Sequence, residues 1–221
     1  RQQGNRHRKS LQNPPQRNPS GRPFHPPVPG SITANIGGSI TAVGDSIDLS
    51  RNEQKRPEFL RLNPNGRIPV IVDSDGPGGA PLSVFESGAI LWYLAEKYPG
   101  LTPSDPVERV RAMEYTFFQV GGVGPMFGQA GWFLRHVEQM PLAIARYKTE
   151  ANRLTAVLET RLQQAPWLAG ATYSIADIMN FGWLRAANYA GVELDQYPLV
   201  RAWVDGIAAR PAVARGLRSL S

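Results

Sequence analysis

The stretch formed by residues 63–90 constrains the fold more than any other part of the chain. It contains two short apolar runs, residues 68–72 and 82–85, separated by the turn-forming sequence SDGPGGA. Two such runs around a turn cluster predict a β-hairpin with a long loop. Pro69 lies inside the first run, where its missing N–H requires a strand edge that stays unpaired. We therefore expect a hairpin with one edge open.

Two polar residues, Glu86 and Ser87, follow the hairpin directly and precede an apolar helix, AILWYLAEKY. The first backbone N–H groups of a helix have no partner within the helix and favour anions. A helix cap needs only one of the two side chains, so the pair favours ligand binding over capping alone. The open edge and the helix N-terminus together predict a site for a short, extended, anionic, peptide-like ligand.

Composition excludes several classes of protein. The chain has 221 residues, is 42% hydrophobic and contains no cysteine. Disulfide staples, cysteine-ligated zinc and a cysteine nucleophile are therefore excluded. No apolar run approaches the eighteen or so residues of a membrane span, and the charged N-terminus precedes no apolar leader. We expect a cytoplasmic protein without membrane association.

The net charge of +6 is concentrated at the N-terminal end of the sequence. Residues 1–44 contain six basic residues and no acidic one, which leaves 18 basic and 18 acidic residues from 45 onward. Because basic and acidic residues are equal in number in the folded part, its composition shows no excess of positive charge that would attract a nucleic acid. We therefore expect no nucleic-acid partner. The histidines, His7, His25 and His136, are too few and too scattered to predict a metal site.

The order of patterns along the chain predicts two domains after an atypical segment. Residues 1–46 are largely disordered by composition, with a weak strand or hairpin near Gly37–Gly38. Residues 47–100 carry a short helix at PEFL, the hairpin and the helix 87–98, and LTPSDP is a linker. Residues 105–221 are helical throughout, with stretches over 106–134, 141–164, 174–189 and 196–209. Ser174 and Asp177 have the spacing of a capping box.

Six motifs in this order resemble the glutathione transferases, most closely the bacterial Nu class with disulfide-bond reductase activity. They are EQKRPEFL (53–60), NPNGRIPVIVD (63–73), FESGAILWYLAEKY (85–98), QVGGVGPMFGQA (119–130), ARYKTEANRL (145–154) and YSIAD (173–177). The resemblance implies an α/β thioredoxin-like N-terminal domain, possibly incomplete, and an all-α helical-bundle C-terminal domain. It also implies glutathione as cosubstrate.

The resemblance assigns parts of a glutathione site to individual residues. Pro69 matches the family's cis-proline, and Ile68 before it would pair its backbone with the cysteinyl part of glutathione. Glu86 would face the γ-glutamyl ammonium, and Ser87 with the helix N-terminus would receive its carboxylate. Gln54 matches a further glutathione contact.

The resemblance also makes a second subunit part of the site. Arg146 matches an arginine that reaches the glutathione of the partner subunit, which implies a homodimer; a solvated surface charge is the alternative. Met126, Gln129 and Trp132 would line a hydrophobic pocket for a second, electrophilic or disulfide substrate. Ser174 and Asp177 match a folding element of the family and carry no catalysis.

One departure from the family pattern concerns catalysis. The group that stabilises the glutathione thiolate should follow the first strand, in a Thr-Pro-Asn-Gly type turn, and residues 1–46 contain no such turn. The catalytic residue therefore has no assignment. A translation of this segment out of the ancestral frame, or a recombination, would explain it. Two functions stay open: a glutathione-dependent transferase or disulfide oxidoreductase, and a catalytically impaired binding or dimerisation scaffold.

Overall fold

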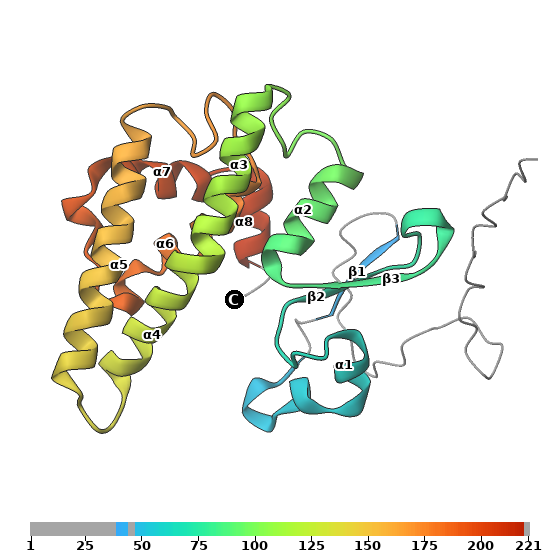
Figure 1. Cartoon of the computed structure of the whole chain (residues 1–221), viewed down its shortest axis with the longest axis horizontal. Helices are drawn as coiled ribbons and strands as arrows, with labels where there is room; N and C mark the ends of the chain where they lie inside the picture. Colours follow the sequence, from blue (N-terminus) through green and yellow to red (C-terminus); the bar gives the residue numbers. More distant parts are fainter. Residues whose placement is uncertain (1–38, 44–46, 219–221) are drawn as a thin grey trace, which may run out of the picture.

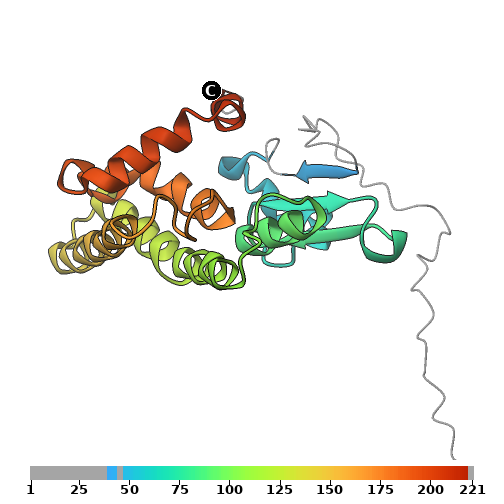
Figure 2. The same ribbon diagram turned by 90° about the horizontal axis from the view of Figure 1, so that it is seen from above.

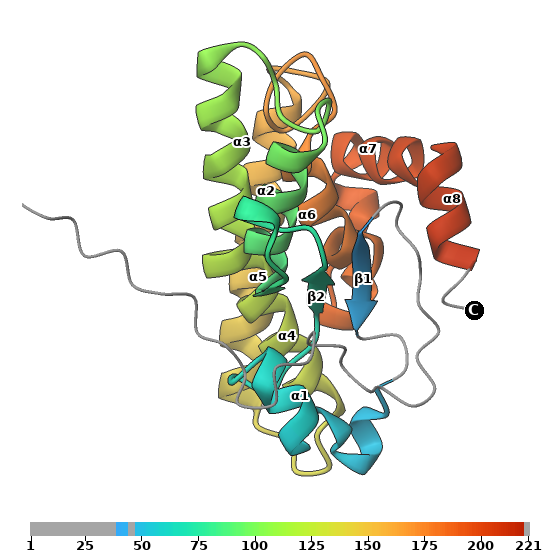
Figure 3. The same cartoon turned by 90° about the vertical axis from the view of Figure 1, so that its right-hand side faces the viewer.

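The computed structural model describes residues 39–43 and 47–218 of the chain. A small β-sheet with its covering helices lies on one side of the molecule, and a larger group of helices lies on the other (Figure 1). Seen from the sheet end, β1, β2 and α1 lie in front of the long helices of the other half (Figure 3). The structure thus has the predicted α/β half followed by an all-helical half.

The sheet has three antiparallel strands in the order β1-β2-β3. The strands are β1 (Ile40–Val43), β2 (Val70–Asp73) and β3 (Leu82–Phe85). β2 and β3 form the hairpin predicted from the two apolar runs, with Val70 opposite Phe85. β1 adds to the other side of β2, with Ile40 opposite Asp73. Every residue of β2 is buried, as expected for a central strand covered on both faces.

One helix covers each face of this sheet (Figure 2). Helix α1 (Pro57–Leu62) begins at a proline and places Phe59 and Leu62 against Val70 and Val72 of β2. Helix α2 (Ser87–Lys97) covers the opposite face, where Ile90 packs with Ile71. Alternate residues of a strand point to opposite faces. Val70 and Val72 of β2 therefore belong to the core beneath α1, and Ile71 belongs to the core beneath α2.

The buried carboxylate of Asp73 links the start of β1, the end of β2 and helix α2. It accepts hydrogen bonds from Ser39 Oγ at 2.5 Å, from the Tyr93 hydroxyl, and from Lys97 Nζ at 2.6 Å. Burial raises the pKa of Asp73, but the bonds from Lys97, Ser39 and Tyr93 outweigh burial and hold the pKa below its usual range. Through these hydrogen bonds, one carboxylate at the end of β2 holds Ser39, which precedes β1, and Lys97, which ends α2.

In the other half, the described residues 105–218 form six α-helices that surround one core. They are α3 (Pro106–Phe118), α4 (Gly124–Arg135), α5 (Pro141–Leu162), α6 (Ile175–Arg185), α7 (Pro198–Ala208) and α8 (Pro211–Arg218). The core centres on fully buried side chains such as Phe127, Leu158 and Leu184. Helix α2 also contributes Ala95 to this core, so it packs between the two halves. Over residues 39–43 and 47–218, no helix is long and apolar enough to cross a membrane.

The structure refines three of the predictions from sequence. The stretch 106–134 is interrupted by a π-helical turn, η4 (Gln119–Val123), between α3 and α4. A further helix, α8, begins at Pro211, where the last helix was expected to stop; proline suits a first helical turn as well as a stop. The weak strand expected before residue 46 is β1, whereas Gly37–Gly38 and the segment 1–30 lie outside the described residues.

Candidate functional site

The NPNG turn before β2 positions the predicted proline. The buried side chain of Asn63 accepts a hydrogen bond from the Asn65 N–H at 2.9 Å and donates one to the Arg67 carbonyl at 2.5 Å. These bonds hold the chain as it enters Ile68–Pro69, whose peptide bond is cis. The Ile68 side chain is 40% exposed, and its backbone N–H and C=O make no hydrogen bond with the residues the structure describes. The predicted open edge is present.

The junction between β3 and α2 lies beside this turn. Glu86 has a φ of 68° and ψ of 118°, a conformation that non-glycine residues rarely adopt. Its carboxylate is exposed and accepts a hydrogen bond from Asn65 Nδ2 at 3.3 Å. Ser87 begins α2, whose first turn has no side-chain cap and no acidic residue. Strained residues concentrate at functional sites, and an uncapped helix N-terminus can receive a carboxylate.

Gln54 reaches the same place from a short 3-10 helix, η2 (Glu53–Lys55). A Cβ at Gly66 of the NPNG turn would lie 3.1 Å from the Gln54 carbonyl oxygen, so this close approach requires glycine there. The Gln54 Oε1 atom is buried and has no hydrogen-bond partner among the described residues. An unpartnered buried oxygen is costly unless a donor from outside the chain meets it.

The predicted site residues therefore divide into two groups. Five of them, from η2, the cis-proline turn and the start of α2, gather around the NPNG turn: Gln54, Ile68, Pro69, Glu86 and Ser87. Arg146 is exposed on α5 in the helical half and makes no ion pair with the described residues. Its assignment to a second subunit stays a prediction.

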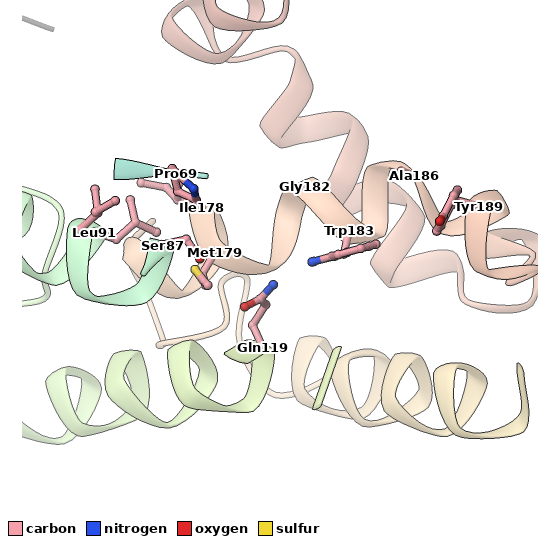
Figure 4. Close-up of a pocket in the computed structure, with 11 residues that line it drawn as sticks. Pro69, Ser87, Leu91, Gln119, Ile178, Met179, Gly182, Trp183, Ala186 and Tyr189 are labelled. Atoms are coloured by element: carbon pink, nitrogen blue, oxygen red, sulfur yellow. The ribbon is translucent and has the colours of Figure 1, made fainter. Parts of the chain in front are cut away.

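A cavity of about 680 Å³ opens beside Pro69 and Ser87, between the two halves (Figure 4). One wall comes from α2, and the other comes from α6, the residues after it and the π-helical turn. The lining residues are Pro69, Ser87, Ile90, Leu91, Gln119, Ile178, Met179, Gly182, Trp183, Ala186 and Tyr189. None of them is charged. An apolar cavity with a few polar groups is the usual form of a small-molecule site.

The second wall differs from the one expected from sequence. Met126, Gln129 and Trp132 are absent from the lining, and Trp132 instead packs against Phe133 and His136 on α4. Met179 and Trp183, four residues apart on α6, take their place. That helical spacing was visible in the sequence, but α6 is apolar on more than one face, so spacing alone does not show which face borders a cavity.

Comparison with known proteins decides the family. The family model of the glutathione S-transferase N-terminal domain matches residues 40–97, and that of the C-terminal domain matches residues 136–211. The chain is 47% identical over 173 residues to the disulfide-bond oxidoreductase YfcG of Escherichia coli K12, covering 77% of this chain and 80% of that protein. The chain belongs to the glutathione S-transferase family.

Solved structures of glutathione transferases resemble this one. One from Burkholderia graminis, with two glutathione molecules bound per subunit, has a TM-score of 0.73 and 43% identity and covers 78% of this chain and 75% of that one. One from Pseudomonas putida, with one glutathione disulfide bound per subunit, has a TM-score of 0.71 and 40% identity and covers 77% of each chain. The resemblance inferred from the sequence motifs is confirmed at the level of family and fold.

Among the residues that the structure describes before β2, no side chain is placed to stabilise a glutathione thiolate at this cavity. The residues before β2 that the structure describes form β1, η1 (Leu49–Arg51), η2 and α1, and none of these supplies a polar residue to the cavity. Nor do the described His, Asp and Glu side chains form any group of three that could hold a metal ion. The groups around the NPNG turn and the uncharged cavity beside them together form the candidate site.

Proposed function

We propose that this glutathione S-transferase is a glutathione-dependent transferase and disulfide oxidoreductase. The observation that carries the proposal is the open backbone at Ile68–Pro69 beside the strained Glu86 and the uncapped start of α2. The cysteinyl backbone of glutathione would pair with Ile68, its ammonium would face Glu86, and its γ-glutamyl carboxylate would lie at Ser87 and the α2 N-terminus. The unpartnered Gln54 Oε1 would accept a glutathione peptide N–H.

The reaction needs sulfur chemistry that the chain itself does not contain, since it has no cysteine. Bound glutathione would supply the thiolate, which attacks one sulfur of a disulfide, forms a mixed disulfide and releases the other half as a thiolate that takes up a proton. A second glutathione then releases the second thiol and forms glutathione disulfide. With an electrophilic carbon that bears a leaving group as the second substrate, the same thiolate forms the C–S bond of a thioether, and the bond to the leaving group breaks so that this group departs as an anion.

A non-catalytic scaffold is the second candidate, favoured by the missing thiolate-stabilising group. Two experiments separate the candidates. An active enzyme should be retained on immobilised glutathione, elute with free glutathione, and reduce hydroxyethyl disulfide at the expense of glutathione. Retention without turnover would support the scaffold instead. A folded protein that is not retained would overturn the enzyme and a glutathione-binding scaffold, and would leave only a dimerisation scaffold.

A homodimer is the arrangement that the surface of α3 supports. Val110, Met113, Phe117 and Val120 are exposed and repeat at helical spacing, so they form one apolar stripe. Met113, Phe117 and Val120 of the stripe also line a second, mostly apolar cavity of about 620 Å³ between α2 and α3, whose rim includes Glu86 and Glu96. Contiguous exposed apolar surface of this kind marks an interface. In a dimer, Arg146 would be available to the glutathione of the partner.

The lack of cysteine fits our proposal of a cytoplasmic location.

Light scattering should therefore give about twice the chain mass of 24.3 kDa. Phe117, 66% exposed, lies within the stripe, and Phe117→Glu should shift the protein to a monomer because a charge would be buried without a partner. Leu142→Glu, at an exposed position on α5 outside the stripe, should leave the mass unchanged. A wild-type monomer at micromolar concentration would contradict the proposal.

A further inference from the structure

A polar pocket of about 430 Å³ lies on the helical half and shares no lining residue with the cavity beside Pro69. One wall is the segment that connects α6 to α7, which contributes Gly191, Glu193 and Gln196. None of the lining residues belongs to the apolar stripe on α3, so the proposed dimer leaves the pocket accessible. The other wall is one face of α5, because its lining residues are three or four positions apart: Ala145, Lys148, Thr149 and Asn152.

Contacts within the chain hold the two walls of this pocket together. Gly191 has a φ of 70°, in the left-handed region that favours glycine. A Cβ there would lie 3.1 Å from Leu134 Cδ1 and 3.4 Å from both Cδ and Cε of Lys148, so the Lys148 side chain packs along this backbone. The Tyr197 hydroxyl donates to Asn152, 3.2 Å from its carbonyl oxygen and 3.2 Å from its Oδ1. The pocket is thus formed in the chain without a ligand, as small-molecule sites usually are.

Two opposite charges line the pocket from opposite walls without pairing. Lys148 on α5 and Glu193 on the connecting segment are exposed, and neither forms an ion pair with the other or with the rest of the described chain. The side chains of Thr149 and Gln196 likewise make no hydrogen bond within residues 39–43 and 47–218. A ligand with a single charge would be attracted by one wall and repelled by the other. A ligand with both charges would be attracted by both.

We propose that this pocket binds a zwitterionic dipeptide, with its carboxylate at Lys148 and its ammonium at Glu193. The two side chains are too far apart for an ion pair, which suits a ligand whose charges stand at opposite ends. A peptide group has one donor and one acceptor, and Thr149 and Gln196 each offer both kinds of group beside it. The inference does not depend on the proposed function, because no residue of the glutathione site takes part.

Calorimetry with capped and uncapped forms of one dipeptide tests whether both charges are read. The probes are L-alanyl-L-alanine, its N-acetyl derivative, which lacks the ammonium, and its C-terminal amide, which lacks the carboxylate. The wild-type protein should bind the uncapped dipeptide at least about 10-fold more tightly than either capped form, the factor expected for one hydrogen bond between charged groups. No measurable binding of the uncapped dipeptide, or equal binding of a capped form, would overturn the proposal.

Charge reversal then locates the site. Lys148→Glu and Glu193→Lys should each weaken binding of the uncapped dipeptide at least about 10-fold, whereas the double variant should recover most of it with the dipeptide reversed. Glu138→Lys makes the same charge change at an exposed position outside the pocket and should bind as the wild type does. Thermal unfolding checks that each variant is folded. Unweakened binding in either single variant, or a double variant no better than the single ones, would contradict the assignment.

Discussion

Replacing Asp177 with alanine is expected to lower the free energy of unfolding by about 3–5 kcal/mol. The Asp177 side chain is 0% exposed and joins three separate segments. Its Oδ1 accepts from the Leu168 N–H at 3.0 Å and from Trp203 Nε1 at 2.9 Å, and its Oδ2 accepts from the Ser174 N–H at 2.9 Å. Alanine would leave these three buried donors without an acceptor, in addition to removing the capping box.

Asp105 offers a matched control for this experiment. It is also an N-cap aspartate, accepting from the Val107 and Glu108 N–H groups at 2.9 Å each, but it is exposed at the start of α3. Asp105→Ala should cost only about 1 kcal/mol, because water can replace the lost acceptor. Urea unfolding of both variants measures the difference. Equal losses would mean that Asp177 acts as a helix cap and nothing more.

The fold was predictable wherever local patterns determine it. The hairpin, α1, α2 and the capping box follow from residues close together in sequence, such as Pro57, Pro69 and the Ser174–Asp177 pair. The π-helical turn was not predictable, because its glycines indicate a break without specifying the type. Likewise, β1 has little strand signal of its own: Ile40 becomes buried only because β2 and α2 supply the apolar surface around it.

The candidate site also has one part that local sequence patterns determine and one part that depends on packing between distant elements. Gln54, Pro69 and Glu86, which we propose bind glutathione, come from motifs on one hairpin and its flanks, and the family pattern predicts them without a structure. The wall around Gln119 and Trp183 depends on how α3, α4 and α6 pack against α2. Neither residue stands out by type, since an isolated glutamine or tryptophan in a helix is ordinarily a surface or a core residue. Only the packing of these helices shows that both residues border the cavity.

Replacing Glu86 with alanine should weaken glutathione binding about 10- to 100-fold, the loss expected for a hydrogen bond between charged groups. Retention on immobilised glutathione gives a first measure, and calorimetry gives the dissociation constant. Glu86→Gln should lose nearly as much, because it keeps the shape and removes the charge that faces the ammonium. Glu58→Gln makes the same change on the exposed surface of α1 and should bind glutathione as the wild-type protein does.

Glu86→Gly separates binding from stability, which the alanine variant cannot do by itself. At a φ of 68° any side chain carries strain, and glycine relieves it, so this variant should unfold at the same temperature as the wild-type protein or higher. The hydrogen bond from Asn65 Nδ2 at 3.3 Å, which this variant loses, is exposed and contributes little. We expect Glu86→Gly to be at least as stable as the wild type and yet to lose glutathione. Undiminished retention in this variant would show that the ammonium lies elsewhere, and that the strain at Glu86 serves only the turn into α2.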